Sequence, residues 1–328
     1  MKREVLLMFV VLMCCQMRAQ QFFTVMSYNI ENAFDTMHDE GKNDYEFCEG
    51  GERKWSYTRL FNKLKSVGKV IAAADEKRPL DLIGLCEVEN DTVMKWLTQR
   101  TSLKNLGYRY LMTHSDDDRG IDVALLYSPF PFHPIENQSI KPKAKKQTTR
   151  DILHVAGTLA NGDTLDVYVI HLPSKRGGSE GQKLSMSICQ QLQAHTDSVR
   201  AVRQHPNLLV MGDFNAETSS QQLKLLTRSH HLIDRTSKLQ PGTYKYQGEW
   251  SILDHILTHT TTLSISKPAS SPSPSSSNQT PPMVVKNPNA PISVLPIKVA
   301  SATIYPSLPP SKSNNHLEKT KRKRAASC

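Results

Sequence analysis

The amino-acid sequence predicts an α/β fold in which two sheets pack face to face with helices on the outside. Apolar runs of strand length recur through residues 22–258, and five of them have a polar residue at one end. Only two or three helical patterns separate these strands, whereas a parallel βαβ winding needs a helix for each crossover. With 328 residues and 38% hydrophobic content, the chain is long enough for one large core. We therefore expect a polar site along one rim of two packed sheets.

The first twenty residues have the layout of a secretory signal peptide. Lys2 and Arg3 precede an apolar run over residues 5–15, and a short polar exit follows. The run is too short to span a bilayer. Cys14 lacks the small residues that precede a lipidation site, so a lipid anchor is the weaker alternative. We predict a signal peptide over residues 1–20, a secreted or periplasmic location, and no transmembrane segment after signal removal.

The next elements are a strand, a loop and a helix. Residues 22–30 alternate between two faces, and Asn29 and Glu31 place a carboxamide and a carboxylate at the end of this strand. Residues 41–51 are acidic and contain glycine, which predicts a surface loop. Apolar residues recur at 3.6 spacing over residues 60–71, so a helix with lysines on its outer face is expected there.

Two further predicted strands each have charged residues at one end. Residues 80–88 form a nearly continuous apolar run that closes on Glu87, and residues 93–97 suggest a short helix after it. Residues 121–127 form another apolar strand, which follows an acidic run and Arg119.

The last strands of the central region also end in polar residues. Residues 164–170 run directly into His171, and residues 184–202 then predict a helix. The apolar run over residues 208–211 stops at a glycine, so Asp213 should lie where a buried strand leaves its sheet.

Taken together, these polar residues suggest a site that binds a metal ion and an anion, although each of them alone also fits a structural role. Asp213 and Asn215 would share one face of extended chain, where they could orient a water or a hard cation. Glu87 could be a Mg²⁺ ligand, His171 could donate to a phosphoryl oxygen, and Arg150 could contact an anion. The structural alternatives are an Asp/Asn turn at Asp213 and Asn215, a helix cap at Glu87, a structural role for His171, and a solvated charged loop at Arg150.

Cysteine spacing and charge disfavour several classes of function. After signal removal four cysteines remain, without a CxxC pair, so neither a disulfide framework nor a zinc site is predicted. Cys86 is expected to be a core residue. The net charge of +10 resides in residues 1–20, with +2, and in residues 263–328, with +8, which leaves the middle near neutral. The lack of a glycine-rich nucleotide loop or an activated cysteine disfavours a redox or thiol enzyme.

Several motifs in order resemble the endonuclease/exonuclease/phosphatase superfamily over residues 22 to about 258. They are Ser-Tyr-Asn29, Cys-Glu87-Val-Glu-Asn, Arg119-Gly-Ile-Asp-Val-Ala-Leu-Leu-Tyr, Thr-Arg150-Asp, Ile-His171-Leu-Pro-Ser, Gly-Asp213-Phe-Asn215 and Trp-Ser-Ile-Leu-Asp254-His255. Any one motif alone is weak evidence, but the occurrence of all of them in the family's order makes the resemblance specific. The pattern looks most like the secreted branch found in Bacteroides-type bacteria.

The resemblance implies a four-layer α/β/β/α sandwich of two mostly antiparallel sheets and Mg²⁺-dependent hydrolysis of a phosphoester by in-line attack, with Mn²⁺ or Ca²⁺ as alternative ions. It implies metal binding by Asn29 and Glu87, catalysis by His171, Asp213, Asn215 and Asp254, and phosphate contact by Arg119 and Arg150. Asp213 would orient the attacking water and His171 would stabilise the pentacovalent phosphorus. Nucleic acid is one candidate substrate, and no stable protein partner is implied.

The C-terminal region departs from this family, which ends in a Ser-Asp-His-Leu-Pro-Val strand with a central histidine. Asp254 follows Asp213 by only 41 residues, so it matches an earlier family aspartate that comes after a hairpin over residues 242–250. His255 is then expected to be a bystander or core residue. The terminal Asp-His pair is missing, and the fold is expected to be incomplete at this end.

Residues 263–328 contain 11 of the 19 prolines and no glycine, a composition that cannot bury a core. One interpretation is a disordered, mucin-like tail. Another is a shifted reading frame, because residues 301–307 can be encoded as TCA GCG ACC ATT TAC CCG TCC, which reads Ser-Asp-His-Leu-Pro-Val from its third base. Our hypothesis places the slip between about Thr258 and Ser264, which gives a domain over residues 22–258 and an out-of-frame tail.

Two classes of function remain. In the first, the chain is a secreted, metal-dependent phosphodiesterase or endonuclease whose activity is impaired by the missing terminal pair. In the second, it is a non-catalytic secreted binding protein whose basic tail docks on anionic polymers. Release of product with Mg²⁺, abolished by EDTA, distinguishes the first class from the second.

Overall fold

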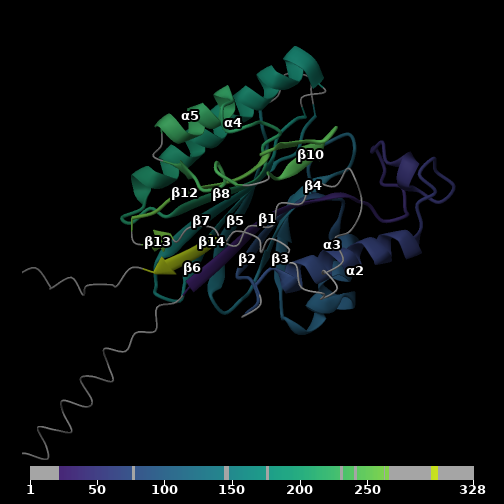
Figure 1. Ribbon diagram of the computed structural model, residues 1–328, viewed down its shortest axis with the longest axis horizontal. Coiled ribbons are helices and arrows are strands. Elements are labelled where there is room, and N and C mark those ends of the chain that lie inside the picture. The colour runs from purple at the N-terminus through teal and green to yellow at the C-terminus, as the bar shows by residue number, and fades with distance from the viewer. Residues whose placement is uncertain are drawn as a thin grey trace, which may run out of the picture.

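The described part of the chain contains two six-stranded sheets packed face to face, with helices on both outer faces (Figure 1). The structure is a computed structural model, and it describes residues 22–75, 78–143, 148–174, 177–229, 232–239, 242–261, 263–265 and 297–301. None of the helices in these ranges has the length and hydrophobicity that a membrane-spanning segment needs.

The first sheet has the strand order β13-β14-β1-β2-β4-β3. Its strands are β1 (Phe22–Ala33), β2 (Leu82–Val88), β3 (Arg109–Met112), β4 (Asp122–Tyr127), β13 (Leu263–Ile265) and β14 (Ile297–Ser301). β1 and β2 are parallel, and the other neighbours are antiparallel. Helices α2 (Tyr57–Ala73) and α3 (Asp91–Arg100) cover its outer face, and the short 3-10 helices η1 (Tyr45–Phe47) and η2 (Ser102–Asn105) lie in its connections (Figure 1).

The second sheet has the order β5-β6-β7-β8-β12-β9. Its strands are β5 (Phe132–Ile140), β6 (Ile152–Leu159), β7 (Thr164–His171), β8 (Leu208–Asp213), β9 (Ile233–Asp234) and β12 (Asp254–His259). Only β7 and β8 are parallel neighbours in it. Helices α4 (Gly178–Val202) and α5 (Gln221–Ser229) cover its outer face, and β10 (Tyr244–Tyr246) and β11 (Glu249–Ser251) form a separate hairpin (Figure 1).

Three apolar layers separate the four structural layers. One lies between the two sheets and includes Leu125, Val155 and Met211. A second lies between the first sheet and its helices, and a third lies between the second sheet and its helices. The prediction of a four-layer α/β/β/α sandwich with mostly antiparallel sheets is therefore confirmed.

The helix and strand boundaries follow local sequence signals. Helix α2 begins after Ser56, whose hydroxyl accepts a hydrogen bond from the Arg59 amide over 3.3 Å, and it buries the predicted apolar face. Helix α4 begins at Gly178, before the predicted start at residue 184. Strand β5 was not predicted because it is an exposed edge strand with a bulge near Pro134, so it has no alternating apolar pattern.

Two strands come from the segment that we expected to lack structure. β14 pairs antiparallel with β1, from Phe22 opposite Ala300 to Val25 opposite Ile297, and β13 pairs with β14. These two short segments are therefore part of the first sheet. Residues 1–20 and most of residues 263–328 lie outside the described residues, so the signal peptide, the disordered tail and the frame slip stay predictions.

Candidate active site

Four polar side chains from central strands of both sheets meet at one end of the sandwich. Asn29 and Glu87 come from β1 and β2, and His171 and Asp213 come from β7 and β8. The Nδ2 of Asn29 donates to Oε1 of Glu87 over 3.3 Å and to Oδ2 of Asp213 over 3.0 Å. The Nε2 of His171 lies 3.9 Å from Glu87 Oε1 and 3.8 Å from Asp213 Oδ2. Residues that are far apart in the sequence thus form one cluster.

The backbone around this cluster adopts conformations that side chains rarely allow. Glu87 has a φ of 62° and Asn215 a φ of 47°, both in the left-handed region. Gly212, directly before Asp213, has a φ of 141°, and a Cβ there would lie 1.9 Å from the carbonyl oxygen of Ile170. Only glycine therefore lets β8 approach β7 so closely at the site.

The local geometry of Asn215 differs from our expectation of extended chain. Because Asn215 is left-handed, its backbone amide turns back and donates to Oδ1 of Asp213 over 2.8 Å. Its Nδ2 donates to the carbonyl oxygen of Leu172 over 2.8 Å, and Phe214 is buried. Asn215 thus lies beside Asp213, as predicted, but an Asx turn rather than strand alternation brings it there.

Burial controls the protonation of the two central groups. Burial raises the pKa of Asp213 to about 6, with the charge of Glu87 adding to it and hydrogen bonds from Asn215 and Asn29 opposing it. Burial, followed by the nearby charges of Arg150 and Arg119, lowers the pKa of His171 well below its usual value. His171 is therefore neutral at pH 7, while Asp213 is mostly ionised.

Two arginines border the cluster in different ways. Arg150 is buried, pairs with Asp117 over 3.1 Å, and donates to the Leu172 carbonyl over 2.9 Å. Arg119 is half-exposed, donates to Asn32 Oδ1 over 2.6 Å, and lies 3.8 Å from Glu87. A cavity of about 480 Å³ brings together Glu87, Arg119, Arg150, His171, Asp213 and Asn215 among its lining residues. Six of the eight predicted site residues therefore line this cavity, and Asn29 donates hydrogen bonds to two of them.

Asp254 lies behind the cavity rather than in its lining. It is the partner of Asp213 in the antiparallel pair of β12 and β8, and it is 2% exposed. Its backbone amide donates to the hydroxyl of Thr243 over 3.1 Å. The neighbouring His255 is fully buried and contacts Asp234 over 2.9 Å, so our expectation that it is a core residue is confirmed.

The oxygen donors of the cluster fit a hard divalent cation, which prefers one or two carboxylates together with water and substrate phosphate. Glu87 and Asp213 supply such carboxylates. The Oδ1 of Asn29 accepts from the Glu31 amide over 2.9 Å while its Nδ2 faces the carboxylates, so Asn29 offers an oxygen to an ion only if its amide turns over.

Asp117 and Glu31 lie near the site without having been predicted to belong to it, and one structural alternative for Glu87 is wrong. Asp117, which holds Arg150, stands in an acidic run that was seen only as the start of a strand. Glu31, whose pKa burial raises to about 7, was grouped with a strand exit without a role. The alternative of Glu87 as a helix cap is wrong, because Asn90 caps α3 and accepts from two backbone amides.

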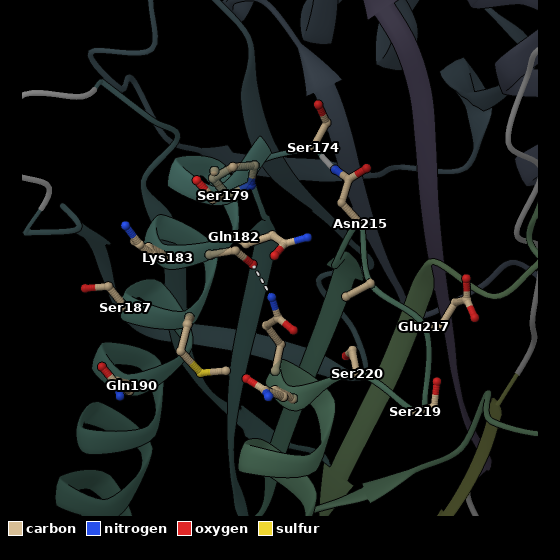
Figure 2. A pocket seen from close by; sticks show the side chains of 17 residues that line it. Ser174, Ser179, Gln182, Lys183, Ser187, Gln190, Asn215, Glu217, Ser219 and Ser220 are labelled. Carbon is tan, nitrogen blue, oxygen red and sulfur yellow. Dashed lines mark hydrogen bonds between the residues drawn. The ribbon is translucent and has the colours of Figure 1, made fainter. Parts of the chain in front are cut away.

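A second cavity adjoins the first between α4 and α5. Its volume is about 670 Å³, and it shares Pro173, Ser174, Gly181 and Asn215 with the first. Figure 2 shows serine, glutamine and asparagine side chains around it, and the amide of Gln222 donates to the Ser185 hydroxyl over 3.4 Å. Among its described lining residues, hydroxyl and carboxamide groups greatly outnumber charged groups.

The sandwich and the cluster of carboxylates, arginines and a neutral histidine define a class of protein, the phosphoester hydrolases. Residues 24–305 match the sequence profile of the Endonuclease/Exonuclease/phosphatase family, and the chain belongs to this family. The matched range extends past residue 258, where we had placed the end of the domain. No curated protein matches the chain.

Solved structures share the fold at low sequence identity. A family protein from Bacteroides thetaiotaomicron has a TM-score of 0.57 at 16% identity, over 86% of this chain and 98% of that one. The catalytic domain of human Nocturnin with bound sulfate has a TM-score of 0.57 at 19% identity, over 86% and 94%. The mannosyl-6-phosphatase Bt3783 of Bacteroides thetaiotaomicron has a TM-score of 0.54 at 15% identity, over 84% and 98%.

Proposed function

We propose that this protein is a secreted, Mg²⁺-dependent phosphodiesterase of the endonuclease type. The main support is that four side chains from four strands of two sheets lie in one cluster. They are Asn29, Glu87, His171 and Asp213. Two carboxylates beside a neutral imidazole and two arginines suit in-line displacement at phosphorus, which depends on positioning and electrostatics.

Glu87 would hold the metal ion, with Asn29 beside it. A bound Mg²⁺ supplies charge neutralisation and orientation of the phosphoryl group, and Mn²⁺ or Ca²⁺ could replace it. The Asn32 amide donates to Glu87 Oε2 over 2.8 Å, which fixes the carboxylate without occupying all of its lone pairs.

Asp213 would orient the attacking water and accept its proton. Its pKa of about 6 leaves it ionised at neutral pH yet close to the working pH, which favours general base catalysis. Asn29 and Asn215 each donate to one of its oxygens, so the carboxylate has one orientation. Asp254, next to it in the sheet, would support this orientation.

His171 would stabilise the pentacovalent phosphorus as a neutral hydrogen-bond donor. Its Nε2 lies too far from both carboxylates for direct hydrogen bonds, and His171 lines the cavity, so this nitrogen could donate to a phosphoryl oxygen bound there. Arg150 and Arg119 would contact the substrate phosphate from the same cavity.

The substrate is a phosphoester, with nucleic acid, a phospholipid or a sugar phosphate as candidates. The adjoining cavity offers hydroxyl and carboxamide groups to a polar part of the substrate (Figure 2). These groups donate and accept hydrogen bonds, so they suit hydroxyl-bearing substrates in general.

The test compares hydrolysis of bis(4-nitrophenyl) phosphate by the chain as it stands and by a protein with the reading frame restored. The restored protein should release 4-nitrophenolate with Mg²⁺, lose this activity in EDTA, and lose it in the Asp213→Ala variant. The unrestored chain should be slower, because it lacks the family's terminal Asp-His pair. A restored protein that binds anionic polymers but cleaves no phosphoester would favour the non-catalytic alternative instead.

A further inference from the structure

A second cluster of metal-binding side chains lies outside the active site, in the loop between β1 and α2. His38, Asp44 and Cys48 each present one donor atom, and these atoms all lie within 4.8 Å of one another. The Nδ1 of His38 is 2.5 Å from Oδ1 of Asp44, and the Sγ of Cys48 is 3.7 Å from the Asp44 carbonyl oxygen. The ring of Tyr45 stacks on the His38 ring at 4.2 Å, which fixes the imidazole. We refer to His38, Asp44 and Cys48 as the loop cluster.

Buried carboxyl groups gather in and around the loop cluster. Asp35, Asp44 and Glu89 are 7%, 1% and 4% exposed. Asn90 donates its amide to Asp35 over 3.1 Å and to Glu89 over 3.2 Å. Within the described ranges no lysine or arginine forms an ion pair with any of these three carboxylates. His38 neutralises Asp44 only when its imidazole is protonated, so a bound cation would stabilise this region.

We infer that the loop cluster is a zinc site. An imidazole nitrogen and a thiolate are ligands of Zn²⁺, whereas Mg²⁺ and Ca²⁺ prefer oxygen alone. On binding, the Cys48 thiol forms its bond to zinc and releases one proton to solvent, and His38 binds as the neutral imidazole through Nδ1. Asp44 supplies the third protein ligand, and a water completes four-coordination.

A metal ion bound at the loop cluster would stabilise the loop between β1 and α2, which donates hydrogen bonds to Asp117 and Asp118 beside the active site. Lys42 and Asn43 lie between His38 and Asp44 in the chain. The ammonium group of Lys42 donates to the Asp117 carbonyl over 2.9 Å, and the Asn43 amide donates to the Asp118 carbonyl over 2.7 Å. Asp117 in turn holds Arg150.

The test follows alkylation of Cys48 in the full chain, reduced and stripped of metal, with iodoacetamide and peptide mass spectrometry. ZnCl₂ should slow the alkylation of Cys48 about tenfold or more, because a thiolate bound to zinc is no longer a free nucleophile. MgCl₂ should have no effect, and EDTA should restore the rate. Cys86 and Cys189 are buried and serve as internal references.

Variants test whether the protection of Cys48 by zinc depends on the loop cluster. The His38→Ala variant should lose the zinc protection of Cys48. The His114→Ala variant, which removes an exposed histidine beside Asp91, should keep it. The Glu87→Gln variant should also keep it, since this carboxylate belongs to the active site. Equal alkylation with and without zinc, or equal protection in the His38→Ala variant, would overturn the proposal.

A second measurement does not depend on the folding of the histidine variant. Co²⁺ added to the stripped wild-type chain should give the thiolate-to-metal absorption of a four-coordinate site. The nearly isosteric Cys48→Ser variant should lack this absorption. An identical cobalt spectrum in the two proteins would assign the ion elsewhere and overturn the zinc site.

Discussion

The side-chain amide of Asn29 joins the two sheets at the active site. Its Nδ2 donates to Oδ2 of Asp213 over 3.0 Å, although the residues are 184 positions apart in the sequence. The same nitrogen donates to Glu87 over 3.3 Å. Asn29 therefore bridges two carboxylates whose charges repel each other.

The Asp213→Asn substitution should lower phosphodiester hydrolysis about 10²- to 10⁴-fold, because the amide cannot accept a proton from the attacking water. The measurement is the rate of 4-nitrophenolate release by the frame-restored protein at saturating Mg²⁺. The Asp197→Asn variant removes an exposed carboxylate on α4 that pairs with Arg200, and it should keep the full rate. A rate near the wild-type value for Asp213→Asn would rule out its role as the base.

The pH–rate profile should have its acid limb near pH 6 in limiting Mg²⁺, because burial raises the pKa of Asp213 to about 6. A carboxyl group acts as a base only when ionised, so activity is present above this pKa and is lost as the pH falls through it. Saturating Mg²⁺ should move the limb to lower pH, since a nearby cation favours the carboxylate.

Glu31 is the control for this assignment. Burial raises the pKa of Glu31 to about 7, so it titrates near the same range. The Glu31→Gln variant should keep the acid limb. A limb that disappears in this variant would show that Glu31, rather than Asp213, is the titrating group.

Binding of Mg²⁺ should raise the melting temperature of the protein, because the ion binds only the folded state. Scanning calorimetry with and without EDTA measures this effect. The Glu87→Gln variant should lose most of the rise, whereas the Glu249→Gln variant, altered at an exposed position on β11, should retain it. An undiminished rise in Glu87→Gln would remove Glu87 from the metal site.

The Gly212→Ala substitution should destabilise the fold by about 3 kcal/mol or more, because a left-handed backbone and a close contact both oppose a side chain. A Cβ would lie 1.9 Å from the Ile170 carbonyl oxygen. Gly162 also has a positive φ, of 89°, but nothing lies within 4 Å of its Cβ position, so Gly162→Ala should cost only about 1 to 2 kcal/mol. Urea unfolding measures both values, and equal costs would show that the contact at Gly212 can relax.

The frame-slip hypothesis predicts a single insertion or deletion in the gene between the codons for Thr258 and Ser264. Restoring the frame should add the Ser-Asp-His-Leu-Pro-Val strand and raise both stability and activity, because the last core strands return. Sequencing independently prepared DNA tests it. An uninterrupted frame through this region would refute the slip.

The sequence by itself predicted the layers of the fold and most of the site residues. Apolar runs that end at Glu87, His171 and Asp213 are local signals, and a buried strand must place its exit residue at a sheet edge. The strands β3, β5, β6, β9 and β12 were not predicted. An exposed edge strand such as β5 or a very short one such as β9 has no apolar pattern to detect, whereas β6 is buried and its apolar run was not assigned.

The tertiary structure alone decided which residues share a space. The bond from Asn29 to Asp213, the support of Arg150 by Asp117 and the left-handed turn at Asn215 depend on how strands from two sheets meet. The loop cluster makes the same point, since cysteine spacing predicted no zinc site, yet folding brings Cys48 to a histidine and an aspartate. Local pattern determines what a segment buries, whereas contacts between distant segments follow from packing, which no single segment encodes.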